Sequence, residues 1–511
     1  MKNKKLSKLV LMAGLAIVLS VSSAMAEQFS VLGRPLNLFG YATQGGSFSL
    51  SDEDKYDTEK GLHSALTNLF LEGDYSITNN LRFYGASMLT VDWIYQLKHN
   101  DSSWNDKLFS KSKKELNVDD KYWQLLKEAH LTWKPENFMI RVGKQIVAWG
   151  ETDGFRLMDQ INPLDQRRGF ADVEFETSII PIWLIRAEYY LTKKPGWLQD
   201  LGFEFVYNPN ADFIPNQSIK TGNADGGIWA PNIPLPGPPP FFESHMATTY
   251  GHIDTPKRWK EGNEFGFRIK GVVYDSTITL NAFYGRDNDP VTRLVPPFLS
   301  PVPPNIFASD GRLLLHPFME GKYPLFRYVG GTFARDITPV KASFLGGVAP
   351  VLRLETLYAF NNTFAFGIPG TPIARFEKSD EFRGAIGVDW KVKIPLLNPK
   401  ALFFISPQFY YRRIIDYPSL EEIQGLKKSN YQTTLLINTS YLHNKLNPSF
   451  FWLRDINSKS DFFRLQLVYD YSDNWHFTLG TLFFHGDKVG QGFQLFDQKN
   501  EIYFKLSYKW S

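Results

Sequence analysis

The part of the chain from Phe463 onward alternates apolar and polar residues most clearly. Apolar side chains recur at every second position at Phe463, Leu465, Leu467, Tyr469 and Tyr471, with Arg464, Gln466 and Asp470 between them. A period of two is that of a β-strand with one apolar and one polar face. Ser472-Asp473-Asn474 then marks a tight turn, and two further rows of the same period follow, over 475–483 and 502–510. This region is therefore predicted to form antiparallel hairpins.

Connections of two kinds alternate along the chain. Short ones are predicted at 78–80, 135–137, 275–276, 397–399, 445–448 and 472–474, and long ones near 51–62, 96–121, 209–262, 287–322, 361–380, 414–430 and 486–499. Outer-membrane barrels have short periplasmic turns, long extracellular loops and both termini in the periplasm, whereas a β-sandwich need not alternate its loops in this way. The pattern predicts an all-β fold, a transmembrane antiparallel β-barrel of about 18 strands, with 16 as the alternative.

The first 26 residues resemble a segment that is removed. Lys2, Lys4, Lys5 and Lys8 precede an apolar run over 9–19, and small residues end at Ala26. This is the pattern of a secretory signal peptide, and the run is shorter than the roughly 20 residues of a membrane-spanning helix. Residues 1–26 are predicted to be cleaved, so that a single barrel domain spans 27–511, starting at Glu27, in the outer membrane of a Gram-negative bacterium.

Composition agrees with a barrel and excludes several other classes. Aromatic residues make up 15% of the chain, yet the mean hydropathy is negative, as expected when lipid-facing and lumen-facing residues alternate and aromatic belts lie at both interfaces. Without the four signal lysines the formal net charge falls from +3 to −1, which gives no argument for nucleic-acid binding. The absence of cysteine excludes disulfides, thiolate metal sites and a lipid attached to cysteine.

One segment carries a resemblance to a known family. Arg141, Gly143, Lys144 and Gln145 are followed by Trp149-Gly150-Glu151 and then by Ile161-Asn162-Pro163 and Asp165. This order resembles the pattern of the outer-membrane proteins grouped as domain of unknown function 1302, and its first part is distantly similar to alginate-export barrels. The stretches from Asn263 and from Leu397 also resemble that family. The resemblance implies a channel-type barrel of unassigned substrate, linked to hydrophobic compounds.

The same segment contains the candidate site. Arg141, Gln145 and Trp149 share the face opposite Ile140, Val142 and Ile146 and are expected to point into the lumen. Lys144 shares parity with the lipid-facing residues, at a cost of ~2–4 kcal/mol at the membrane midplane, so a bulge at Gly143 is predicted.

The charged stretch after Trp149 is expected to fold into the lumen as a constriction, since opposed charges discriminate solutes in a pore. The alternative is that its charges form ion pairs that pin the barrel rim. The candidate residues of this constriction are Arg141, Gln145, Trp149, Glu151, Asp153, Arg156, Asp159, Asp165, Arg167 and Arg168.

Other charged positions are also expected to face inward, mostly as wall-stabilising networks. They are Glu72, Asp74, Arg82, Glu128, His130, Arg268, Lys270, Arg353, Glu355, Arg383, Asp389, Lys391 and Arg464.

Two proline-rich stretches, 230–242 and 295–304, predict stiff polyproline II segments. With Phe241, Phe242 and Phe298 they are expected to form an apolar mouth that collects hydrophobic solutes, or alternatively rigid loops that cover one another.

Motifs of hydrolases, nucleotide-binding enzymes and zinc proteases are missing from the sequence, so no catalytic residue, metal or cofactor is predicted. The expected function is passive passage of small or hydrophobic solutes, with a non-conducting receptor, adhesin or scaffold barrel as the alternative. Expected partners are outer-membrane lipid, an unidentified solute and the barrel-assembly machinery. The sequence does not distinguish a monomer from a trimer.

Overall fold

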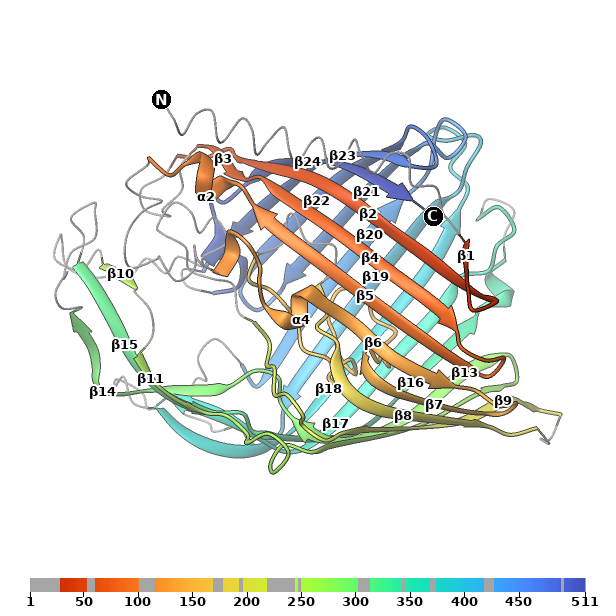
Figure 1. Cartoon of the computed structure of the whole chain (residues 1–511). Coiled ribbons are helices and arrows are strands. Elements are labelled where there is room, and N and C mark those ends of the chain that lie inside the picture. Colours follow the sequence, from red (N-terminus) through yellow and green to blue (C-terminus); the bar gives the residue numbers. More distant parts are fainter. Residues whose placement is uncertain are drawn as a thin grey trace.

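A computed structural model describes residues 28–52, 60–100, 115–168, 178–192, 196–217, 244–246, 250–301, 313–341, 345–367, 374–417, 427–488 and 491–510. Within these residues 18 antiparallel strands form a closed barrel (Figure 1). In chain order the barrel strands are β2 (Arg34–Ser49), β4 (Leu66–Ser76), β5 (Leu81–Asp92), β6 (Leu126–Trp133), β7 (Phe138–Gln145), β8 (Ile182–Tyr190), β9 (Leu198–Asn208), β12 (Glu264–Val273), β13 (Ser276–Arg286), β16 (Leu325–Asp336), β17 (Val351–Gly367), β18 (Ala374–Val392), β19 (Phe403–Ile414), β20 (Ser429–Asn438), β21 (Leu446–Asp455), β22 (Ser460–Asp470), β23 (Trp475–Gly486) and β24 (Glu501–Trp510).

The barrel closes between its first and last strands. β2 pairs with β24 from Gly40↔Trp510 to Ser49↔Glu501, and with β4 along its other edge. Closure removes the unpaired edges that an open sheet would expose to lipid. The predicted fold is therefore confirmed, with 18 strands rather than 16. The segment 1–27 lies outside the described residues, so the signal peptide stays a prediction.

The two ends of the barrel differ, as Figure 1 shows with the larger connections on the left. Short turns at 77–80, 134–137, 274–275 and 471–474 lie at one end, together with the C-terminal strand end and β1 (Gln28–Val31), which pairs back onto β2. The opposite end carries the remaining small elements: β3 (Gly61–Ser64), α2 (Ile94–Leu97), α4 (Tyr122–Leu125) and η7 (Gly492–Phe496). The connection after β16, which was not among the predicted turns, contains η5 (Thr338–Val340).

Two predicted loops contain strand instead. The predicted loop 361–380 is largely the extended hairpin of β17 and β18, whose pairing continues beyond a register shift between Ala359 and Asn362. Within 287–322, β14 (Val291–Pro301) pairs with β15 (Leu313–Lys322). Together with β10 (Ser244–Met246) and β11 (Tyr250–Asp254), they form a four-stranded sheet outside the barrel. The polyproline II prediction for 295–301 is therefore wrong, because a register shift between Leu294 and Leu299 accommodates the prolines within a strand.

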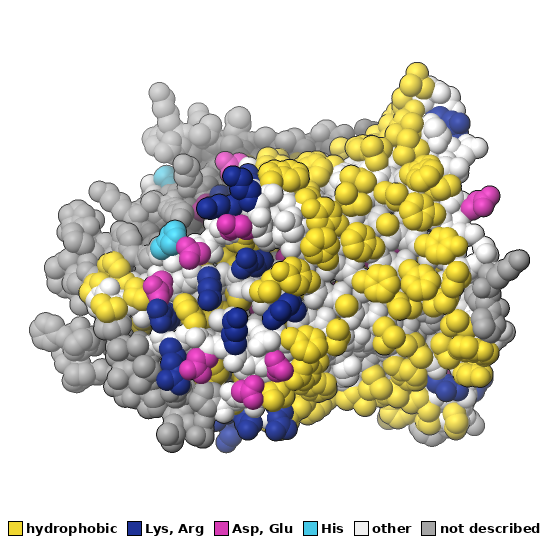
Figure 2. Space-filling view, turned by 90° about the horizontal axis from the view of Figure 1, so that it is seen from below, with side chains coloured by type: hydrophobic (Ala, Val, Ile, Leu, Met, Phe, Trp, Pro, Cys, Tyr) yellow, Lys and Arg dark blue, Asp and Glu magenta, His cyan; other side chains and the backbone are white. Residues whose placement is uncertain are grey.

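The outer wall is apolar. Phe477, Leu479 and Phe483 of β23 are exposed, whereas Leu482 on the opposite face is buried, so the alternation predicted from the sequence places apolar side chains toward lipid. Figure 2 shows the resulting hydrophobic belt beside a zone where charged side chains gather toward the loop end. No helix among the described residues is long and apolar enough to span a membrane.

Candidate functional site

The chain leaves the barrel wall after β7 and enters the lumen. We call residues 146–168 the infolded segment. Its two stems are joined by Asn162, whose Oδ1 accepts from Val147 N at 2.8 Å and whose Nδ2 donates to the carbonyls of Gln145 and Ile180, both at 3.1 Å. Asn162 is fully buried, and its amide satisfies backbone groups that the end of β7 leaves without a strand partner. This fixes the angle at which the segment enters the barrel.

Trp149 anchors the segment to the wall on β9 and β12. Its Nε1 donates to Glu204 Oε1 at 3.1 Å, and its ring lies against Gly266, where a Cβ would come within 2.5 Å of the ring. Asp159 accepts from the backbone amides of Trp149 and Gly150 at 2.5 and 2.9 Å. These hydrogen bonds join the part of the segment that enters the lumen to the part that returns from it.

Glu355 of β17 holds the far part of the segment. Its carboxylate accepts from Glu151 N at 2.7 Å and from Met158 N at 2.8 Å, and its exposed fraction is 1%. Arg353, two residues earlier on the same inward face, contacts Asp153 at 2.6 Å and Asp389 at 2.7 Å. Hydrogen bonds to charged groups are the strong ones, so these contacts dock the segment firmly.

The tip of the segment reaches the opposite side of the barrel. Gly154 N donates to the hydroxyl of Tyr410 at 3.1 Å, and the ring of Phe155 packs edge-on against Tyr410, with centroids 4.9 Å apart. A Cβ on Gly154 would also touch Thr434 of β20. Since β8, β9, β12, β13, β16, β17, β18 and β19 lie between β7 and β20, the tip is half-way round the 18-stranded barrel from its origin.

The segment forms the main apolar core inside the barrel. Val147, Trp149, Leu157, Met158 and Ile161 are buried against inward-facing side chains of the strands β8 to β19. Phe155 packs in addition against a second cluster on β21 to β24 and η7, made of Leu453, Phe462, Leu482, Phe484, Phe496 and Tyr503. Phe155 thus joins the segment to the side of the lumen that it does not otherwise cover.

A buried ion cluster lies at the loop end of the segment. Arg167 contacts Asp119 at 2.5 Å and Asp165 at 2.8 Å, and its guanidinium lies 4.6 Å from the ring of Trp123. Arg168 donates to the carbonyl of Leu116 at 2.8 Å. Burial alone raises the pKa of Asp165, but the hydrogen bonds and charge of Arg167 outweigh it and lower that pKa below its ordinary value. The cluster ties the infolded segment to the connection between β5 and β6.

The residues predicted to form the constriction therefore lie in different parts of the structure. Asp165, Arg167 and Arg168 lie in the ion cluster. Trp149, Glu151, Asp153, Arg156 and Asp159 belong to the part of the segment inside the barrel, where Arg156 donates to the carbonyl of Asn162 at 2.9 Å and burial raises the pKa of Glu151. Gln145 is fully buried and donates to the carbonyl of Leu184 at 3.1 Å.

Arg141 belongs to a row of three arginines that cross adjacent strands. Arg82 of β5 lies opposite Thr132 of β6, Thr132 opposite Arg141, and Arg141 opposite Arg186 of β8. Arg82 pairs with Asp74, and Arg186 with Glu188 and Glu204. Among the described residues Arg141 forms no ion pair within 4.0 Å, and its Nε donates to Thr132 at 2.9 Å. Arg82 and Arg186 are therefore paired with carboxylates, whereas Arg141 is the member of the row without a carboxylate in contact among the described residues.

Lys144 is accommodated differently from the prediction. The pairing of β7 with β6 and β8 runs through Gly143 without a register shift, so the predicted bulge is absent and Lys144 keeps its outward parity. Its ammonium is buried beside α4 and donates to the carbonyls of Trp123, Leu126 and Lys127 at 3.1, 2.5 and 3.1 Å. No residue near Lys144 in the sequence indicates this helix end, because α4 belongs to the connection before β6.

Several partners of the infolded segment were not predicted from the sequence, and part of the predicted apolar mouth lies outside the described residues. Arg186, Glu204, Gln408 and Tyr410 were not singled out, although their inward parity could have been extracted from the alternation of their strands. Phe241 and Phe242 lie outside the described residues, and Phe298 lies in β14. No group of three or more His, Cys, Asp or Glu residues suited to a metal ion occurs in the described part of the chain.

A closed 18-stranded antiparallel barrel with an apolar outer belt and a charged interior defines a transmembrane β-barrel of the outer-membrane type. The chain belongs to the DUF1302 family, described as proteins of unknown function, whose family model matches residues 9–510. No curated protein matches the sequence.

Solved structures with similar folds are outer-membrane proteins. The outer-membrane channel DcaP of Acinetobacter baumannii is 10% identical, with a TM-score of 0.40, over 94% of this chain and 99% of DcaP. The outer-membrane protein OmpT of Vibrio cholerae is 8% identical, with a TM-score of 0.38, over 96% of this chain and 100% of that one. An anion-selective porin from Comamonas acidovorans is 9% identical, with a TM-score of 0.36, over 93% and 100%.

Proposed function

We propose that the protein is a passive outer-membrane channel for small solutes and that the infolded segment sets its narrowest point. The observation that carries the proposal is the course of this segment, which leaves the wall at β7, follows the inner wall and contacts β19 and β20 on the far side. In this proposal the solutes pass on the side of the lumen that the segment does not follow, past the contact of Phe155 with the cluster on β21 to β24.

Arg82, Arg141 and Arg186 lie on β5, β7 and β8, close to the place where the infolded segment leaves the wall. Arg82 has 61% of its side chain exposed, and the Arg141 guanidinium has no carboxylate partner among the described residues. Guanidinium groups bind carboxylate and phosphate groups through paired hydrogen bonds. The proposed solutes are therefore small molecules with an anionic group, in preference to purely hydrophobic ones.

The test is single-channel conductance in planar bilayers, before and after removal of the tip. Residues 151–158 can be excised and Gly150 joined to Asp159, because the amide of Gly150 already lies 2.9 Å from Asp159 Oδ1. We expect the intact protein to conduct and the shortened protein to conduct several-fold more, with barrel folding checked by heat-modifiable electrophoretic mobility.

Two results would contradict the proposal. Equal conductance of both proteins would show that the segment is not the narrowest point. No conductance from either protein at any voltage would favour the second candidate, a barrel closed by its loops that acts as a receptor, adhesin or scaffold. The contact of Phe155 with the cluster on β21 to β24 is the observation that favours this second candidate, since it joins the segment to the uncovered side.

A further inference from the structure

A groove crosses the membrane-facing side of β5 to β9. Its volume is about 1120 Å³, slightly above the usual range of small-molecule sites, which ends at about 1,000 Å³. Phe83, Leu131, Val142, Ile185 and Tyr207 line it as directly opposed neighbours on five successive strands. Leu131 and Val142 are 45% and 48% exposed. The floor is therefore a continuous apolar strip at the depth of the lipid chains.

The groove reaches the loop end of the barrel, where the connections form its walls. Tyr122 of α4 lines one part, and Pro209, Ala211, Asp212, Arg258 and Trp259, from the connection after β9, line another. The site thus extends from the hydrocarbon region to the outer edge of the apolar belt.

Three cations surround Trp259 in the connection after β9. Lys257, Arg258 and Lys260 are all exposed, as is Trp259 at 66%. Arg258 pairs with Asp212 at 2.7 Å, and Glu261 accepts from the backbone amide of Lys257 at 3.3 Å. Neither Lys257 nor Lys260 forms an ion pair with any other described residue, so the rim has an excess of positive charge that faces outward.

Asn210 fixes the shape of this rim. Asn210 is buried, its carbonyl accepts from Trp259 N at 3.0 Å, and its Nδ2 donates to the carbonyl of Lys257 at 3.4 Å and to that of Glu261. Trp259 has a φ of 60°, a conformation rarely adopted by a bulky side chain. The turn is therefore held in a fixed geometry that presents Trp259 between the lysines.

We propose that this groove binds a lipid of the outer leaflet that carries several acyl chains and phosphate groups. An acyl chain lies on Leu131, Val142 and Ile185, Trp259 lies at the interface, and the phosphates lie beside Lys257 and Lys260. Tryptophan is enriched at membrane interfaces, and clustered Lys and Arg attract anionic lipid headgroups. The charge of the rim selects the phosphate, and the floor selects the chain.

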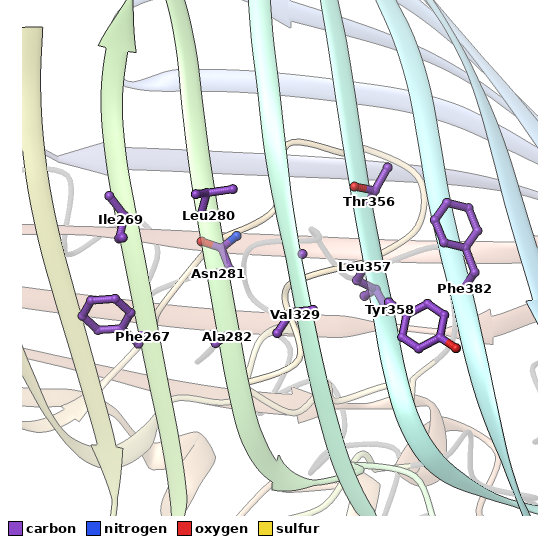
Figure 3. A pocket seen from close by; sticks show the side chains of 11 residues that line it. Phe267, Ile269, Leu280, Asn281, Ala282, Val329, Thr356, Leu357, Tyr358 and Phe382 are labelled. Carbon is purple, nitrogen blue, oxygen red and sulfur yellow. The ribbon is translucent and has the colours of Figure 1, made fainter. Parts of the chain in front are cut away.

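A second groove on the same outer wall serves as an internal comparison. It has a volume of about 430 Å³ and lies over β12 to β18, where Figure 3 shows Phe267, Ile269, Leu280, Val329, Tyr358 and Phe382. None of its described lining residues is charged, so it offers lipid chains a surface without a site for a headgroup. The two grooves differ in the feature on which the proposal depends.

The experiment is native mass spectrometry of the folded protein titrated with three probes: diphosphoryl lipid A, monophosphoryl lipid A and phosphatidylcholine. The rim variant carries Lys257→Gln, Arg258→Gln and Lys260→Gln. The charge-matched control carries Lys393→Gln, Lys400→Gln and Lys445→Gln, three exposed lysines at the short-turn end. A third variant, Val142→Trp, fills the floor and leaves all charges in place.

We expect the wild type to bind diphosphoryl lipid A more tightly than the other two probes. The rim variant should bind it roughly tenfold or more weakly, from the loss of three cations near an anionic headgroup, and the control variant should bind it as the wild type does. Val142→Trp should also weaken binding, which shows that the chain as well as the phosphate is recognised.

Other outcomes overturn the proposal. Equal binding of the three probes would show that the groove takes hydrocarbon without recognising phosphate. An equal loss in the rim and control variants would show unspecific attraction between charges. A change from an oligomer to a monomer in Val142→Trp, with no change in lipid binding, would assign the groove to contact with a second copy of the chain.

Discussion

Glu355 is the position where one substitution should release the tip of the infolded segment without changing the barrel wall. Its carboxylate accepts from two backbone amides of the segment at 2.7 and 2.8 Å, and it is almost fully buried. Hydrogen bonds to charged groups contribute about 1.5–3 kcal/mol each. Because water can enter the space left by Glu355→Ala and partly replace them, we take about 3 kcal/mol for the pair, which changes the ratio of docked to undocked tip roughly 100-fold.

The assay uses the absence of cysteine from the chain. A single Met158→Cys reporter places a thiol where the side chain is 0% exposed, so a water-soluble maleimide reacts only when the tip leaves the wall. We expect the reaction to be about 100-fold faster in the Glu355→Ala background, accompanied by larger and noisier single-channel currents.

Glu72→Ala is the matched control, since Glu72 is an inward carboxylate of β4 that bonds Tyr84 and none of the infolded segment. Equal labelling rates in the Glu355→Ala and Glu72→Ala backgrounds would refute the assignment of Glu355 as the main anchor.

Three further predictions concern the same segment and its surroundings. A Cβ on Gly154 would lie 3.6 Å from the Cβ of Thr434, within the range for a disulfide, so Gly154→Cys with Thr434→Cys should crosslink. The oxidised and reduced forms should conduct equally, and a rise on reduction would show that conduction requires an undocked tip. Arg167→Met removes the cation that hydrogen-bonds both Asp119 and Asp165 and leaves only Arg168, 3.8 Å from Asp119. It should lower the free energy of unfolding by ~3–5 kcal/mol, measured by urea unfolding in lipid vesicles, with a smaller loss in Arg167→Lys. Burial raises the pKa of Asp287 to about 6, so the folded protein favours the protonated side chain. The contribution of this carboxyl group to the free energy of unfolding is complete below the unfolded-state pKa of about 3.9 and is lost as the pH rises through 6. The free energy of unfolding of Asp287→Asn should therefore equal that of the wild type at pH 4 and exceed it at pH 8. If the two proteins differ by the same amount at both pH values, the pKa of Asp287 is not raised by folding.

The barrel could be predicted from the sequence because its signals are local. Alternation with a period of two, as in 463–471, decides which side of a strand meets lipid, and turn residues such as Ser472-Asp473-Asn474 mark where strands reverse. Each of these signals is complete within about ten residues. The strand count followed from them, and the structure confirms 18.

The errors arose where distant parts of the chain decide the structure. The hairpin of β17 and β18 extends into the predicted loop 361–380 because its ladder continues to Gly367↔Ala374, and no local residue predicts how far two strands stay paired. Lys144 was expected to require a bulge, yet the carbonyls at the end of α4 satisfy its ammonium. That helix lies in a connection whose position depends on closure of the barrel.

The candidate site was predictable in composition but not in its contacts. The sequence indicated a charged, glycine-containing segment after Trp149, and that segment lies inside the barrel. Its main partners Glu355 and Gln408 are 204 and 255 residues away from the groups they contact. Only barrel closure places β17 and β19 opposite β7, so strand parity alone could not select them from the other inward-facing polar residues.

The residues of 145–165 that resemble the family pattern, here called the motif, are largely buried, and this bears on how such a channel would select its solutes. Gln145, Trp149 and Asn162 are at most 1% exposed, and each bonds backbone or a wall carboxylate. Side chains used in this way hold the segment in place and cannot also contact a passing solute. We therefore expect substitutions within the motif to change the size of the conductance by undocking the segment, whereas substitutions of Arg82 or Arg141 should change the preference for anions and leave the docked segment in place. Constriction and selectivity would then reside in different residues of the same lumen.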